Sequence, residues 1–167
     1  MSPPPSDLRI PKHRVRVELC LHQGVVLRTE VFVTEHDGRP WRRQDVHDLF
    51  EQTSAFLPAR ALDEESWMVV SRDALLWVRL VDEPPRDEEP VEAEELFDVQ
   101  RAVRVELVSG PALIGDLLYS PPPGHARVAD FLNETGRFFP LWTDAGEVLV
   151  SKAHVVRVFE TASRMGS

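Results

Sequence analysis

A short run of basic and aromatic side chains, "RPWRR" at residues 39–43, is the part of this sequence best suited to ligand chemistry. Arg39, Arg42 and Arg43 surround Trp41 there. Guanidinium groups bind phosphate oxygens, and an indole ring stacks on a nucleotide base. These four residues are therefore candidate nucleic-acid- or phosphate-binding residues. The alternative is that the arginines are attracted to the acidic segment at 82–98 instead.

Catalysis finds little support in the sequence. Cys20 is the only cysteine, and it ends an alternating strand pattern, so we expect a plain buried thiol rather than a nucleophile. Neither G-x-S-x-G nor a glycine-rich phosphate loop is present. Glu35, His36 and Asp37 stand together in a stretch that is typical of a solvated polar turn. We predict a protein with no catalytic residues, no cofactor and no metal site. An enzyme would require a pocket that the sequence does not reveal.

Tryptophan side chains indicate a second kind of surface. Trp77 lies on the strand face opposite Leu76 and Val78, so it points outward if those two residues face the core. An exposed tryptophan on a strand is typical of a contact surface. Trp77 and Trp41 are therefore candidate protein-binding residues. For Trp77, packing between two parts of the same chain is the alternative.

The formal net charge of −9 is concentrated in one segment. Residues 82–98, "DEPPRDEEPVEAEELFD", carry a net charge of −8, and the rest of the chain carries −1. The segment is too charged to enter a core, so an exposed linker is expected. The remaining, nearly neutral chain argues neither for nor against binding to a polyanion.

Composition indicates an ordinary globular protein, with 43% apolar residues to build a core. No apolar run approaches the roughly 20 residues that span a bilayer. The N-terminal stretch "MSPPPSDLRIPKHR" lacks the apolar region of a signal peptide. We therefore expect a cytoplasmic protein without membrane contact.

The chain contains an internal duplication. "VRVEL" occurs at 15–19 and again at 103–107, and Gly24 or Gly110 follows each copy. Two longer matches follow in the same order: "DLFEQTSAFLP" at 48–58 with "DFLNETGRFFP" at 130–140, and "WMVVSRDALLWVRL" at 67–80 with "EVLVSKAHVVRVFE" at 147–160. The predicted organisation is an N-terminal tail at 1–12, repeat one at 13–80, an acidic linker at 81–100, repeat two at 101–160 and a C-terminal tail at 161–167.

Each repeat is predicted to be mainly β. Strict alternation at 15–19 and 103–107 indicates strands with one buried and one wet face, and the two glycines mark hairpin turns. Apolar residues at i, i+3 and i+4 predict a short helix within 44–51 and within 127–134. About five short strands and one helix per repeat suit a strongly bent barrel that closes to avoid exposed strand edges. The expected fold is two tandem five-stranded small barrels.

The repeats resemble the Sm and Hfq group of small, SH3-like barrels. "VRVELVSGPALIGDLLY" is similar to the opening hairpin of that group, and "GEVLVSKAHVVRV" is similar to its closing strands. The chain is also similar to uncharacterised bacterial proteins with the pattern D-x-L-N … F-x-P-L … V-x-x-K-x-H-I, which "DFLN", "FFPL" and "VLVSKAHV" follow. The resemblance implies two tandem Sm-like barrels, each with one short helix.

For function, the resemblance implies RNA binding. In RNA-binding members, an Asp and an Asn in one loop and an Arg-Gly in the last turn hold a base. Asp130 and Asn133 match the first pair, and Ser151-Lys152 replaces the Arg-Gly. Repeat one has Glu51 where repeat two has Asn133, and an acid there would repel a phosphate.

Two functions are therefore kept open. The first is a non-enzymatic cytoplasmic scaffold that acts through protein–protein contacts, with its two barrels packed together as a pseudo-dimer. The second is an Sm-like RNA- or nucleotide-binding regulator that uses "RPWRR" with Asp130, Asn133 and Lys152. The partner's identity and the formation of a homo-oligomer are left open.

Overall fold

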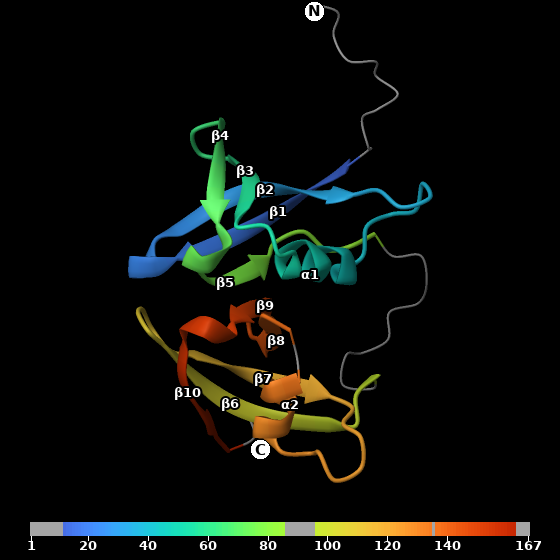
Figure 1. Cartoon of the computed structure of the whole chain (residues 1–167), viewed down its shortest axis with the longest axis vertical. Coiled ribbons are helices and arrows are strands. Elements are labelled where there is room, and N and C mark those ends of the chain that lie inside the picture. Colours follow the sequence, from blue (N-terminus) through green and yellow to red (C-terminus); the bar gives the residue numbers. More distant parts are fainter. Residues whose placement is uncertain (1–11, 86–95, 135, 163–167) are drawn as a thin grey trace, which may run out of the picture.

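The computed structural model describes residues 12–85, 96–134 and 136–162, which form ten strands and two α-helices (Figure 1). Repeat one contains β1 (Lys12–Leu21), β2 (Val26–Thr34), α1 (Arg43–Glu51), β3 (Phe56–Ala61), β4 (Ser66–Ser71) and β5 (Leu75–Leu80). Repeat two contains β6 (Val99–Leu107), β7 (Leu113–Tyr119), α2 (Val128–Glu134), β8 (Phe138–Thr143), β9 (Gly146–Ser151) and β10 (Val155–Glu160). Short 3₁₀ turns lie at His22–Gly24, Arg72–Ala74 and Lys152–His154. No helix within the described ranges is long and apolar enough to cross a bilayer.

All ten strands belong to one antiparallel sheet in the order β10-β6-β7-β8-β9-β5-β1-β2-β3-β4. Each repeat contributes five neighbouring strands in the same relative order, with repeat one above repeat two in Figure 1. The prediction of a mainly β chain with five strands and one helix per repeat is confirmed.

The sheet does not show the two closed barrels that we expected. Within the described residues, β5 pairs with β1 and with β9 of the other repeat rather than with β4, and β4 pairs only with β3. The reason is that β9 already satisfies the second edge of β5, so repeat one does not have to close on itself to cover that edge. One continuous sheet with two free edges, β4 and β10, is the result.

The alternating patterns become strands as predicted. Val15, Val17 and Leu19 of β1 are buried, whereas Arg14 and Arg16, which alternate with them, are exposed. β6 repeats this arrangement. Gly24 and Gly110 adopt φ angles of 78° and 79°, a left-handed conformation that favours glycine and allows the chain to turn.

The two helices lie where the i, i+3, i+4 patterns placed them. In α1, Val46 and Phe50 are buried in the core, while the Asp45 carboxylate accepts a 2.8 Å hydrogen bond from the Arg42 N–H and caps the helix. In α2, Phe131 packs on Tyr119 with ring centroids 4.6 Å apart. Each helix thus packs its apolar side chains against the core of its own repeat.

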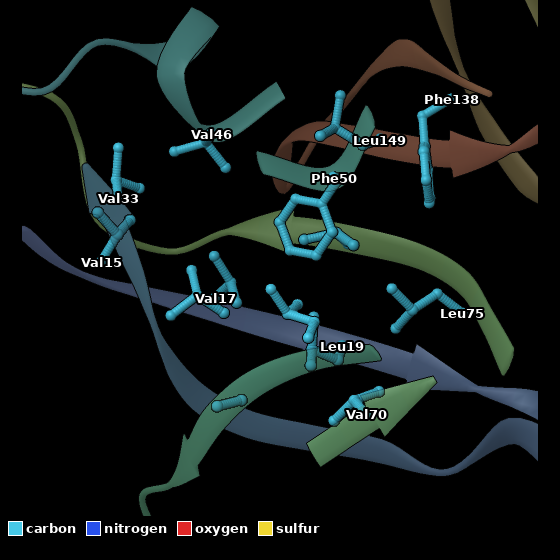
Figure 2. Packing of buried hydrophobic residues seen from close by; sticks show 14 of the residues in the cluster. Val15, Val17, Leu19, Val33, Val46, Phe50, Val70, Leu75, Phe138 and Leu149 are labelled. Atoms are coloured by element: carbon cyan, nitrogen blue, oxygen red, sulfur yellow. The ribbon is translucent and has the colours of Figure 1, made fainter. Parts of the chain in front are cut away.

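Each repeat has a hydrophobic core, and each core includes side chains from the other repeat. The core of repeat one includes Phe138 and Leu149 from repeat two, and the core of repeat two includes Cys20 and Leu76 from repeat one. Figure 2 shows Phe138 and Leu149 close to Phe50 of α1. The Phe50 and Phe138 ring centroids are 6.1 Å apart. The repeats are therefore packed together through shared core residues.

The predicted linker is described only in part. Residues 86–95 lie outside the described residues, as do 1–11 and 163–167. β6 begins at Val99, so the last two residues of the predicted linker belong to a strand.

Candidate protein-binding surfaces

The contact between the repeats, called the joint below, is an antiparallel strand pair. In β5 and β9, Trp77 lies opposite Val150, Val78 opposite Leu149 and Arg79 opposite Val148. The pairing joins the last strand of repeat one to the fourth strand of repeat two. It is therefore a contact between two different edges of the duplicated unit.

Apolar side chains cross the joint in both directions. Cys20 and Leu76 are 5% and 0% exposed, and Phe138 and Leu149 are 6% and 5% exposed. Burying a Leu or Phe side chain stabilises a fold by roughly 1.5–3 kcal/mol. Burial also raises the pKa of the Cys20 thiol, which favours its protonated form. The joint is thus a continuation of both cores.

A buried carboxylate orients the joint. Glu147 of β9 is 4% exposed, and it accepts hydrogen bonds from Arg43 of α1, at 3.1 Å, and from His47 of α1. The Arg43 guanidinium also lies 5.6 Å from the centre of the Trp142 ring. A buried charge needs such partners, because an uncompensated one is strongly destabilising. These contacts tie α1 of repeat one to β9 of repeat two.

A second carboxylate holds the start of β8. Glu51, the last residue of α1, accepts 2.8 Å hydrogen bonds from the backbone N–H groups of Arg137 and Phe138. The Arg137 side chain in turn donates to Asp73 at 2.8 Å. Helix α1 therefore contacts β9 through Arg43 and His47, and the start of β8 through Glu51.

The strands that form the joint have counterparts in the other repeat, and these counterparts lie at the free edges of the sheet with their apolar side chains exposed. In repeat one, Phe56 and Val69 match Phe138 and Leu149, yet they are 60% and 67% exposed. We call Phe56, Val69 and the neighbouring Trp67 the β4 end. Trp67 is 68% exposed and stacks on Phe32 at 5.2 Å.

The other free edge is equally apolar. In repeat two, Val108 and Val156 match Cys20 and Leu76, and they are 52% and 60% exposed. We call Val108, Val156 and the half-exposed Phe159 the β10 end. Four positions that are buried at the joint are thus apolar and exposed at the two ends. A sequence signal existed for this, because aligning the repeats residue by residue shows that all four positions are apolar in both copies.

A cavity of about 720 Å³ lies beside the joint, between α1 and repeat two. Aromatic and proline side chains form much of its wall: Tyr119, Phe131, Trp142, Pro121, Pro122 and Pro140. Arg43, His47 and Glu147 also reach it, but they are bound to one another. The cavity therefore suits an apolar group better than a charged one.

The "RPWRR" residues do not form one basic surface. Trp41 is 8% exposed and belongs to the core of repeat one, and Arg43 is turned toward Glu147. Arg39 donates to both oxygens of Asp45, at 3.0 and 3.1 Å. Arg42 is exposed, and its backbone caps α1. The structure thus places carboxylate partners on two of the three arginines, although these partners lie outside the acidic segment.

The Arg39–Asp45 pair perturbs both groups. The hydrogen bond to Asp45 raises the pKa of Arg39. Burial acts to raise the pKa of Asp45, but the hydrogen bonds from the Arg39 side chain and the Arg42 backbone outweigh it, so the pKa lies below its ordinary value. Asp45 is therefore a charged helix cap at neutral pH.

The three residues that the Sm resemblance singled out lie in different surroundings. Asp130 and Asn133 lie on α2, where Asp130 pairs with Arg127 at 3.2 Å and this hydrogen bond lowers the pKa of Asp130. Lys152 lies in the last 3₁₀ turn and lines a separate cavity of about 300 Å³ with Arg72, Arg137 and His154. Burial lowers the pKa of Lys152. Sequence reasoning missed this basic cluster because its members come from both repeats.

Trp77 is half-buried and packs against the core of repeat two. Of its two interpretations, packing between the repeats is the one that its position favours. No family model, curated protein or solved structure matches the chain.

Proposed function

We propose that this protein is a non-enzymatic cytoplasmic scaffold that binds other protein chains at the two ends of its sheet. One observation carries the proposal: Phe56, Val69, Val108 and Val156 are exposed, whereas their counterparts in the other repeat are buried at the joint. Clustered apolar side chains on a surface are typical of protein contact sites.

The two free strands support this function. Proteins that must avoid edge-to-edge contact place charges or prolines on their edge strands. β4, "SWMVVS", has neither, and β10, "VVRVFE", has one arginine and one glutamate. Arg157 of β10 is bound to Glu106 at 2.7 Å within its own repeat. Both edges therefore remain able to accept another strand.

We further propose that each repeat is an Sm-like, SH3-like small barrel whose wall is left open at one edge. The same relative strand order in the two repeats supports this, as does the helix between the second and third strands of each. On this view, each repeat can pair with a neighbour through its fourth strand or its fifth strand. Within the chain, only the fifth strand of repeat one, β5, and the fourth strand of repeat two, β9, are used in this way.

A pull-down from native lysate at low salt tests the scaffold function. A stoichiometric protein band is expected with the wild-type chain and with Ile114→Arg, because Ile114 is an exposed apolar residue on β7, which lies inside the sheet between β6 and β8. The band should be lost with Val69→Arg or with Val156→Arg. Capture that survives both end variants would contradict the proposal.

An RNA- or nucleotide-binding regulator is the second candidate. Arg137, Lys152 and His154 around one cavity favour it, although Asp73 offsets one of these charges. Arg72 also lines the cavity, but it is buried and donates to backbone carbonyls. Because Arg39 and Arg43 are held by carboxylates, this candidate rests on the cavity that Lys152 lines rather than on "RPWRR". RNA affinity that falls with salt and is lost in Lys152→Ala, but is retained in Arg42→Ala, would support it.

A further inference from the structure

The joint provides a template for pairing the two free edges with each other. At the joint, β5 of one repeat meets β9 of the other. The counterpart of β9 in repeat one is β4, and the counterpart of β5 in repeat two is β10; these are the two strands left with a free edge. We propose that β4 of one copy of this chain pairs antiparallel with β10 of a second copy. This inference rests on the proposed function and names the partner.

The duplication fixes the register of this pairing. In the last two strands, each residue of repeat one corresponds to the residue 80 positions later in repeat two. Transferring the Leu149–Val78 pair of the joint places Val69 of one copy opposite Val158 of the next. The flanking pairs become Val70 with Arg157 and Met68 with Phe159. Every residue in the new register except Arg157 is apolar.

The apolar side chains that cross the joint between the repeats have counterparts that would cross the contact between copies. At the joint, Leu149 and Phe138 enter the core of repeat one, and Leu76 enters the core of repeat two. At the ends, Val69 and Phe56 would take the first role against the repeat-two core of a second copy. Val156 of that copy would take the role of Leu76 against the repeat-one core of the first.

The pairing joins unlike ends and therefore leaves each copy with one free end. The β4 end presents the outer face of a hairpin, whereas the β10 end presents the outer face of the first and last strands of its repeat. A contact between two different surfaces is heterologous, and it continues into a closed ring or an open filament. We therefore expect assemblies larger than a dimer at high protein concentration.

The polar contacts of the joint are not repeated at the ends. Glu147 corresponds to Trp67, and Glu51 corresponds to Asn133. Asp73 and Arg137 both correspond to alanines, Ala153 and Ala55. The contact between copies is thus apolar where the joint is partly ionic. It should be weaker than the joint, reversible, and insensitive to salt, because no ion pair carries it.

Sedimentation velocity of the full chain over a concentration series, at low and high salt, tests the inference. The average mass should rise above the 19.0 kDa of one chain by a similar amount at both salt concentrations. Val69→Arg and Val156→Arg should each weaken pairing by about a hundredfold, because an arginine would be buried without a partner. Ile114→Arg should assemble like the wild type.

Mixing the two end variants gives the sharpest test. Val69→Arg retains an intact β10 end and Val156→Arg an intact β4 end, so an equimolar mixture should form a 1:1 dimer that grows no further. Self-association of either variant alone at wild-type affinity would mean that like ends pair, and would overturn the inference. Circular dichroism and a cooperative unfolding transition establish that both variants are folded.

The failure of this inference is distinguishable from failure of the scaffold function. A wild-type chain that stays at 19.0 kDa at every concentration overturns pairing between copies. If that chain still captures a different protein, and Val69→Arg does not, the scaffold function stands without self-pairing. If the chain neither self-associates nor captures a protein, both proposals fail.

Discussion

The carboxylate of Glu147 in repeat two receives a 3.1 Å hydrogen bond from the guanidinium of Arg43 in repeat one, across 104 positions of sequence. Glu147 is almost fully buried, and its other oxygen accepts a hydrogen bond from His47. This contact distinguishes the joint from the free ends of the sheet, where the position of Glu147 is occupied by Trp67.

Arg43→Ala should lower the free energy of unfolding by about 1–3 kcal/mol, because it leaves a buried carboxylate with one partner fewer. Urea unfolding measures this change. The double variant Arg43→Ala with Glu147→Gln should recover part of the loss, since the buried charge is then gone. Arg16→Ala is the matched control, because the Arg16–Asp82 pair is exposed and worth less than about 1 kcal/mol. Equal effects of Arg43→Ala and Arg16→Ala would contradict a special role for Glu147.

Leu76→Ala should destabilise the chain by about 2–5 kcal/mol. Leu76 belongs to repeat one but is buried in the core of repeat two, so its truncation would leave a cavity there. Val156→Ala, at the matching position of repeat two, should change stability by less than about 0.5 kcal/mol in dilute protein. Tryptophan fluorescence during urea unfolding reports both. A small effect of Leu76→Ala would mean that the two cores do not depend on each other.

The stability of the chain should fall in acid through Asp45. Its folded pKa lies below the ordinary value of 3.8, so its ionised form stabilises the fold at any pH above that value. This stability is lost as the pH falls from 3.8 through the lower folded pKa, where the folded carboxylate takes up its proton.

Asp45→Asn tests this effect, because the asparagine oxygen can still accept the hydrogen bond from the Arg42 N–H but carries no charge. The variant should be less stable than the wild type at pH 7, and the difference should shrink below pH 3.8. Thermal unfolding across the pH range measures it. Asp48→Asn, on the exposed face of the same helix, is the control and should cost less stability at pH 7 than Asp45→Asn.

The thiol of Cys20 should report opening of the joint. Because Cys20 is 5% exposed and burial raises its pKa, it should react slowly with a thiol reagent in the folded chain and rapidly in urea. Leu76→Ala loosens the surrounding core and should speed the reaction severalfold under native conditions. Phe56→Ala, at the β4 end, should leave the rate unchanged. Fast reaction of the wild-type thiol would place Cys20 outside a packed joint.

Local patterns carried the prediction of the elements. Alternation in "VRVEL" and i, i+3, i+4 spacing in "DVHDLF" depend only on neighbouring residues, so strands, helices and their number per repeat followed from the sequence. Barrel closure did not follow, because a strand edge can be covered by any other edge. β5 pairs with β9 rather than β4, and contacts between residues distant in sequence, such as Arg43–Glu147, accompany this arrangement.

The candidate site shows the same division. "RPWRR" suggested a basic patch because residues close in sequence are seen together, but Asp45 and Glu147 bind two of its arginines and the core takes Trp41. The sequence by itself determined that one unit of five strands and a helix is present twice. Only the tertiary structure decided that Leu76 is buried and Val156 exposed, because burial depends on which surfaces meet. Within one open sheet the two repeats meet once, through β5 and β9, so the corresponding strands β10 and β4 are left at the edges.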